Sequence, residues 1–149
     1  MSASDPGGPY LLCYDGSDAA RQAIHAAARL LGPGRRSTLM YVYKPTERSL
    51  GVAQALTGGT IDAPVSGEPD ARAVLDAGAA AARDAGFDVD PLLVEADRRV
   101  AEIIAATAEE LDSPAIVMGQ RGRSALKSAL LGSVSRDVVN AYHRPVILV

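Results

Sequence analysis

The sequence contains very little cysteine and no long apolar segment. Cys13 is the only cysteine among 149 residues, which excludes an internal disulfide and a cysteine-based metal cluster. No apolar run approaches the roughly 20 residues of a transmembrane helix, and the first nine residues lack the basic start and apolar core of a secretory signal. We therefore expect a cytoplasmic protein in which Cys13, placed in an apolar run, is an inert core residue.

Two motifs of phosphate-binding enzymes are also missing. Neither the strict phosphate loop, Gly-x4-Gly-Lys-Ser/Thr, nor Gly-x-Gly-x-x-Gly occurs, so fast triphosphate hydrolysis of the phosphate-loop kind is not supported. His25 and His143 do not have the spacing of zinc ligands, and neither forms a recognisable pair with Cys13, a serine or an acid. The sequence therefore predicts no catalytic residue and no metal held by protein side chains alone.

Charge and length restrict the class of protein further. Fifteen basic and 18 acidic residues give a net charge of −3, which disfavours general attraction to nucleic acid or an anionic membrane. A hydrophobic fraction of 48% is typical of a globular protein, and the length suits one domain with a substantial core. We interpret residues 1–149 as a single domain in which residues 1–9, small and polar, form a flexible N-terminus.

Short apolar runs alternate with helical patterns along the chain. The runs predict five strands, at residues 10–14, 38–43, 87–94, 115–118 and 146–149. Apolar residues at helical spacing predict helices at residues 20–31, 71–82, 100–111 and 134–141. Strands that are joined through helices lie parallel, and right-handed crossovers place helices on both faces. The pattern therefore predicts an α/β fold with a doubly wound parallel sheet.

Local signals suggest where these helices begin and where the pattern fails. Ser17 or Asp18 can cap the first helix, and Asp97 can cap the third. Residues 44–69 carry no clear pattern beyond one possible short helix near residues 50–56, so we interpret them as a long irregular connection.

The most informative stretch follows the fourth predicted strand. Gly119 and Gly122 are separated by two residues, and after nine more residues Gly132 and Ser133 open the last predicted helix. Glycines let a backbone approach a ligand closely, and the free N–H groups and dipole of a helix start attract anions. Doubly wound sheets bind ligands beyond the carboxyl ends of their strands, where Asp15 should also lie. The pattern favours a phosphate-binding cradle.

These segments resemble the universal stress protein family, most strongly at Tyr10 to Ser17 and Ser113 to Val149. Members that bind nucleotides carry Gly-x-x-Gly, nine residues, and then Gly with Ser or Thr, and the sequence matches this pattern in full. The resemblance implies a Rossmann-like sheet in the order 3-2-1-4-5, similar to the adenine nucleotide alpha hydrolase fold. It also implies a homodimer paired through Val146 to Val149, an apolar strand that would otherwise be an exposed edge.

The resemblance further implies an adenine nucleotide, ATP with Mg²⁺, as the ligand. In the family an aspartate at the position of Asp15 contacts the adenine or ribose, and the backbone at Val42 contacts the adenine. Relatives often have a hydroxyl residue where this chain has Val134, a departure that affects one of the family's phosphate or metal contacts. The implied binding residues are Asp15, Gly16, Val42, Met118, Gly119, Arg121, Gly122, Arg123, Gly132, Ser133, Val134 and Ser135.

The resulting functional hypothesis is an ATP-binding stress-response or signalling protein that is not an enzyme. No general base or water-positioning residue stands out, so any hydrolysis should be slow. A binder of AMP or cyclic AMP and a slow ATPase or phosphotransferase are the alternatives. A nucleic-acid module of the KH type shares a Gly-x-x-Gly loop, but the order of strands and helices and the acidic charge argue against it.

Overall fold

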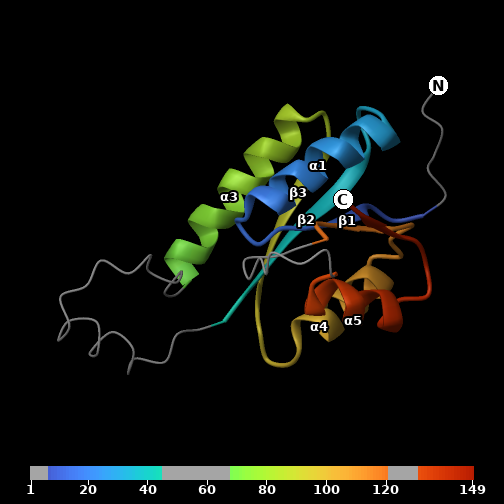
Figure 1. Ribbon diagram of the computed structural model, residues 1–149. Helices are drawn as coiled ribbons and strands as arrows, with labels where there is room; N and C mark the ends of the chain where they lie inside the picture. Colours follow the sequence, from blue (N-terminus) through green and yellow to red (C-terminus); the bar gives the residue numbers. More distant parts are fainter. Residues whose placement is uncertain (1–6, 45–67, 121–130) are drawn as a thin grey trace.

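The computed structural model describes residues 7–44, 68–120 and 131–149, in which strands and helices alternate (Figure 1). The short helix expected near residues 50–56 lies outside the described residues. The elements are β1 (Tyr10–Cys13), α1 (Asp18–Leu31), β2 (Arg36–Tyr43), α3 (Glu68–Asp84), β3 (Asp88–Glu95), α4 (Val100–Glu110), β4 (Ile116–Met118), α5 (Ser133–Ala141) and β5 (Val146–Leu148).

All five strands belong to one parallel sheet in the order β3-β2-β1-β4-β5, which confirms the expected topology. The central strand β1 lies between β2 and β4, with Leu12 opposite both Leu39 and Val117. Because the strands run in the same direction, their carboxyl ends meet at one edge of the sheet. Strand β2 continues to Tyr43 and so extends past its last partner in β1, where Cys13 lies opposite Met40.

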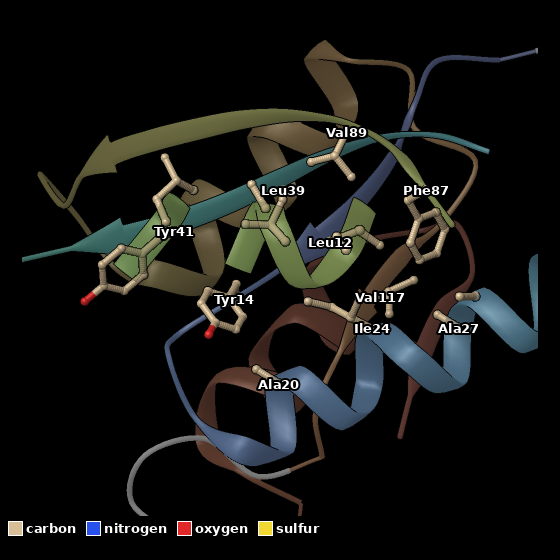
Figure 2. Packing of buried hydrophobic residues seen from close by; sticks show 14 of the residues in the cluster. Leu12, Tyr14, Ala20, Ile24, Ala27, Leu39, Tyr41, Phe87, Val89 and Val117 are labelled. Atoms are coloured by element: carbon tan, nitrogen blue, oxygen red, sulfur yellow. The ribbon is translucent and has the colours of Figure 1, made fainter. Parts of the chain in front are cut away.

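Two hydrophobic cores fix the helices on opposite faces of the sheet. Helices α1 and α3 cover one face, where Leu12 and Leu39 pack with Ile24 of α1, as Figure 2 shows. Helices α4 and α5 cover the other face, where Leu11 and Met40 are buried. Successive residues of a strand point to opposite faces, so neighbouring apolar residues serve both cores. The doubly wound arrangement predicted from the alternating pattern is confirmed.

Helix α1 starts as its local sequence predicts, whereas α4 does not. The Ser17 hydroxyl accepts a hydrogen bond from the N–H of Ala20 at 3.1 Å, which makes Ser17 the N-cap of α1. The capping role expected for Asp97 is wrong, because α4 begins two positions later with Arg99 as its N-cap. The N–H of Ala96 bonds to the carbonyl of Tyr43 at 2.8 Å, which keeps the chain beside β2 and delays the helix.

The turn between α4 and β4 contacts both the start of the described chain and the end of α5 at the amino edge of the sheet. The N–H of Gly8 donates to the carbonyl of Asp112 at 2.8 Å. The hydroxyl of Tyr142, at the end of α5, donates to the carbonyl of Ser113 at 2.7 Å. Residues 1–6 lie outside the described residues, so the flexibility expected for residues 1–9 stays a prediction.

We expect Gly78→Ala to destabilise the protein, although alanine is the better helix former. Gly78 is buried in α3, and an added Cβ would lie 2.5 Å from Cδ1 of Tyr14, whose ring is only 4% exposed. Overpacking costs about 1–3 kcal/mol, against a gain of about 1 kcal/mol in helix propensity. The net loss, up to about 2 kcal/mol on these figures, is measured by urea denaturation.

The matched control for this prediction is Ala80→Gly. Ala80 is an exposed residue of the same helix, so this variant reports helix propensity without the contact to Tyr14. A free energy of unfolding for Gly78→Ala above that of the parent would contradict the prediction, since the Tyr14 ring would then have moved aside at little cost.

Candidate functional site at the carboxyl edge of the sheet

The end of β1 is turned away from the sheet by Asp15 and Gly16. The N–H of Tyr14 makes the last bond to β2, at 2.9 Å from the carbonyl of Met40. Gly16 then adopts a φ of 82°, a conformation that favours glycine. One carboxylate oxygen of Asp15 accepts a hydrogen bond from the N–H of Ser17 at 2.9 Å. Its second oxygen makes no bond within the described residues and can accept one from a ligand.

The extension of β2 past β1 leaves the backbone of Val42 open on one side. Backbone groups alternate in direction along a strand. The carbonyl of Met40 accepts from Tyr14 on the β1 side, and the carbonyl of Tyr43 accepts from Ala96 on the β3 side. Val42 therefore presents its N–H and C=O toward the β1 side, beyond the last β1 residue in register with β2. This places one donor and one acceptor beside the Asp15 turn.

The backbone of Gln120 joins the ends of β4 and β5 to the start of α5. Its N–H donates to the carbonyl of Val149 at 2.9 Å, and its carbonyl accepts from the N–H of Gly132 at 2.8 Å. Val149 in turn donates its N–H to the carbonyl of Met118 at 3.2 Å. The N–H of Gly132 is thus used within the protein and is not a donor for a ligand.

The first turn of α5 supplies the free donors at this edge. Gly132 is the N-cap and makes no side-chain capping bond, and the first helical bond runs from the N–H of Arg136 to its carbonyl at 3.0 Å. The N–H groups of Ser133, Val134 and Ser135 therefore have no partner inside the helix. Gly132 has φ −58° and ψ 153°, which most residues can adopt. Gly132 therefore precedes these donors without a side chain of its own.

Ser135 has a different place from the one expected of a ligand-binding hydroxyl. It is 3% exposed, and its hydroxyl donates to the carbonyl of Gly119 at 3.0 Å. The side chain therefore ties the first turn of α5 to the end of β4. Ser135 supports the position of the helix start, and its backbone N–H remains one of the free donors.

Nine of the expected binding residues lie together at the ends of β1, β2 and β4 and at the start of α5. They are Asp15, Gly16, Val42, Met118, Gly119, Gly132, Ser133, Val134 and Ser135. Arg121, Gly122 and Arg123 lie outside the described residues, so their assignment stays a prediction. Sequence reasoning missed the roles of Gln120 and Val149, because a backbone hydrogen bond leaves no mark on side-chain identity.

Within residues 7–44, 68–120 and 131–149, no three His, Cys, Asp or Glu side chains are grouped so that they can hold a metal ion. None of the helices described there has the length and apolar character to cross a membrane.

Cys13 lies two residues before Asp15 and is held in its neutral form. Burial and, to a smaller extent, the negative charge of Asp15 together raise the pKa of its thiol to about 12. Because the thiolate is the reactive form, this environment opposes alkylation and oxidation.

The parallel sheet order β3-β2-β1-β4-β5, with helices on both faces, defines the class: a doubly wound, Rossmann-like α/β protein. Residues 9–149 match the model of the universal stress protein family. The chain belongs to this family.

Known members and solved structures agree with this assignment. The chain is 34% identical over 140 residues to the universal stress protein in the QAH/OAS sulfhydrylase 3′ region of Thermus aquaticus, covering 93% of this chain and 96% of that one. A universal stress protein from Archaeoglobus fulgidus, solved in complex with dAMP, has a TM-score of 0.63 at 23% identity, covering 95% and 96%. Another, in complex with cAMP, has a TM-score of 0.63 at 21% identity, covering 96% of each chain. These structures share the fold.

We expect Ser135→Ala to lower stability, because it leaves the carbonyl of Gly119 without its side-chain donor. Loss of a buried hydrogen-bond partner costs about 1–3 kcal/mol. The exposed neighbour Ser133 is the matched control, and Ser133→Ala should change stability by less than about 0.5 kcal/mol. Thermal unfolding without nucleotide measures both variants. Equal effects of the two substitutions would show that the bond to Gly119 does not stabilise the fold.

The thiol of Cys13 should resist iodoacetamide in the native protein. At pH 8 a pKa of about 12 leaves about one thiol in ten thousand ionised. We expect no modification by mass spectrometry under conditions that alkylate a free cysteine completely, and full modification in denaturing urea. Rapid alkylation of the native protein would contradict the burial of this residue.

Proposed function

We propose that this protein binds an adenine nucleotide, ATP with Mg²⁺, at the carboxyl edge of the sheet. We further propose that it acts in stress response or signalling through its nucleotide-dependent state, in the cytoplasm and without being an enzyme. The observation that carries the proposal is that three complementary features lie at the same edge of the sheet. These are the open backbone of Val42, the free oxygen of Asp15 and the uncapped start of α5.

The base and ribose would occupy the part of the crevice near β1 and β2. Adenine carries an amino donor and a ring-nitrogen acceptor on one edge, and the N–H and C=O of Val42 offer the complementary pair. The second oxygen of Asp15 can accept hydrogen bonds from a ribose hydroxyl or the base amino group. Gly16 keeps this turn free of a side chain.

The phosphates would lie at the start of α5. The N–H groups of Ser133, Val134 and Ser135 and the positive end of the helix dipole favour an anion there. Gly119 and Gly132 leave room for the ligand, and the proposal extends to Met118, Arg121, Gly122 and Arg123 as further contacts in the same cradle. Mg²⁺ keeps several waters and binds through phosphates, so it can arrive with the nucleotide.

A second candidate is a binder of AMP or cyclic AMP with the same crevice. Similar universal stress proteins have been solved in complex with dAMP and with cAMP. These complexes support adenine nucleotides as the class of ligand and do not favour ATP over AMP or cyclic AMP. A slow ATPase would also use the crevice, and would show turnover that depends on Asp15 or Gly122. A nucleic-acid role is disfavoured by the net charge of −3.

The two open edges of the sheet support a homodimer through β5. The outer strand β3 exposes Asp88, Asp90, Pro91 and Glu95, residues typical of an edge protected against pairing. Strand β5 contains only valine, isoleucine and leucine, all half-buried. Two copies related by a two-fold axis can pair their β5 strands, so that the open backbone groups of both strands are hydrogen-bonded.

The proposal is tested by calorimetric titration of the nucleotide-stripped protein with Mg-ATP, AMP and cyclic AMP. Asp15→Asn retains an oxygen that can accept from Ser17 but removes the charge. Hydrogen bonds to charged groups contribute about 1.5–3 kcal/mol, so its affinity should fall about tenfold or more. Gly132→Val should abolish binding by covering the donors of α5, with circular dichroism showing that it is still folded.

Asp88→Asn is the matched control, because it makes the same chemical change at the amino edge of the sheet. Equal affinities of the Asp15 and Asp88 variants would remove Asp15 from the site. Tighter binding of AMP or cyclic AMP than of ATP would favour the second candidate. Absence of heat and of competition at millimolar nucleotide would refute nucleotide binding.

A further inference from the structure

We infer that nucleotide binding at the start of α5 and pairing of two copies along β5 are thermodynamically coupled through shared backbone hydrogen bonds. The inference rests on the proposed nucleotide site and β5 dimer, and goes beyond both. The linking structure is called the β4–β5–α5 corner and consists of Met118, Gly119, Gln120, Gly132, Ser135 and Val149.

Three backbone hydrogen bonds run in sequence through this corner. Val149 follows β5 directly and donates its N–H to Met118 at 3.2 Å, while its carbonyl accepts from Gln120 at 2.9 Å. The carbonyl of Gln120 accepts from Gly132, the N-cap of α5, at 2.8 Å. Val149, which follows β5, and Gly132, which opens the proposed phosphate site, are thus linked through a single residue, Gln120.

A side-chain bond adds a second connection between the same elements. The hydroxyl of Ser135 donates to the carbonyl of Gly119 at 3.0 Å. Gly119 lies between the two β4-side residues that hold Val149, so α5 is attached to this end of β4 through Ser135 as well as through Gly132. A displacement of Val149 therefore acts on the position of the first turn of α5.

Strand β5 can transmit the state of its outer edge to this corner. It has three residues and, among the strands that the structure describes, pairs with β4 alone. Short edge elements open at a low cost in free energy, so we expect β5 to open transiently. Pairing with a second copy would order β5, and a bound phosphate would order the start of α5. Each event would order part of the structure that the other event also needs to order, so the second event loses less conformational entropy. The coupling is therefore positive.

Backbone direction separates the bonds of the dimer from those of the corner. Pro145 and Val149 use their backbone groups toward β4, at 3.1 Å to Ile116 and 3.2 Å to Met118. Because directions alternate, the N–H groups of Val146 and Leu148 point to the outer edge. A proline at position 148 removes an outward donor, and a proline at position 149 removes the inward bond to Met118.

The experiment measures the dimer dissociation constant by sedimentation equilibrium with and without saturating Mg-ATP. We expect ATP to tighten the dimer by about 5- to 150-fold, the usual range for coupled sites. Leu148→Pro should be monomeric and should bind Mg-ATP more weakly by the same factor, because coupling is reciprocal. Leu148→Ala, which loses similar packing but keeps the N–H, should remain a dimer with nearly parental ATP affinity.

The variant Val149→Pro tests the corner itself. It keeps the outward donors, so we expect it to dimerise and to bind ATP, with a coupling factor close to one. Val149→Ala keeps the bond to Met118 and should retain the parental factor. A Val149→Pro protein with full coupling would show that the linkage does not pass through this hydrogen bond and would overturn the inference.

The failures of the two proposals are distinguishable. A parent that binds Mg-ATP with an unchanged dimer constant, or that stays monomeric at every concentration with and without ATP, refutes the coupling and leaves the nucleotide site intact. A parent that binds no adenine nucleotide in the titration refutes the proposed function and the coupling with it.

Discussion

Parallel pairing of strands of unequal length is the constraint on which the candidate site depends. Parallel strands bring every carboxyl end to one edge, but aligned ends alone would leave no open backbone. Here β1 leaves the sheet at Asp15, with Gly16 at a φ of 82°, while β2 continues to Tyr43. The open peptide groups of Val42 follow from this difference in length. A turn one residue later in β1 would cover them.

Helices α1 and α5 both begin at this edge but differ in their N-caps, and this difference indicates which helix could bind a ligand. Helix α1 begins there, and its N-cap Ser17 accepts a hydrogen bond from one N–H of the first turn, that of Ala20. Helix α5 begins there with Gly132, which offers no side chain and no capping bond. Buried or crowded N–H groups must find partners, and we propose that the uncapped N–H groups at the start of α5 find theirs in the ligand. The two helices also lie on opposite faces of the sheet (Figure 1), so a ligand bound at the start of α5 would lie on the α4–α5 side.

Local signals allowed much of the fold to be predicted, and long-range contacts account for the rest. Continuous apolar runs located all five strands, and Ser17 fixed the start of α1, because each of these effects acts within a few residues. The strand order came from resemblance to the family, since periodicity carries no information about neighbours. The start of α4 was misplaced at Asp97 because a bond between Ala96 and Tyr43, far apart in sequence, holds the chain to β2. The contact of Ser135 with Gly119 was missed for the same reason.

The candidate site is built from backbone groups more than from side chains. This limits the effect expected from its one departure from the family pattern, at position 134. Val134 stands where relatives often have a hydroxyl residue, and it is 37% exposed in the first turn of α5. The substitution removes one hydroxyl donor but not the N–H of the same residue, which has no partner in the helix. Among the described residues, the proposed phosphate donors are all peptide groups, at a helix start that is held by the bonds of Gly132 and Gln120 and by the Ser135 bond. Changes that move this frame should therefore weaken binding more than loss of a hydroxyl at position 134.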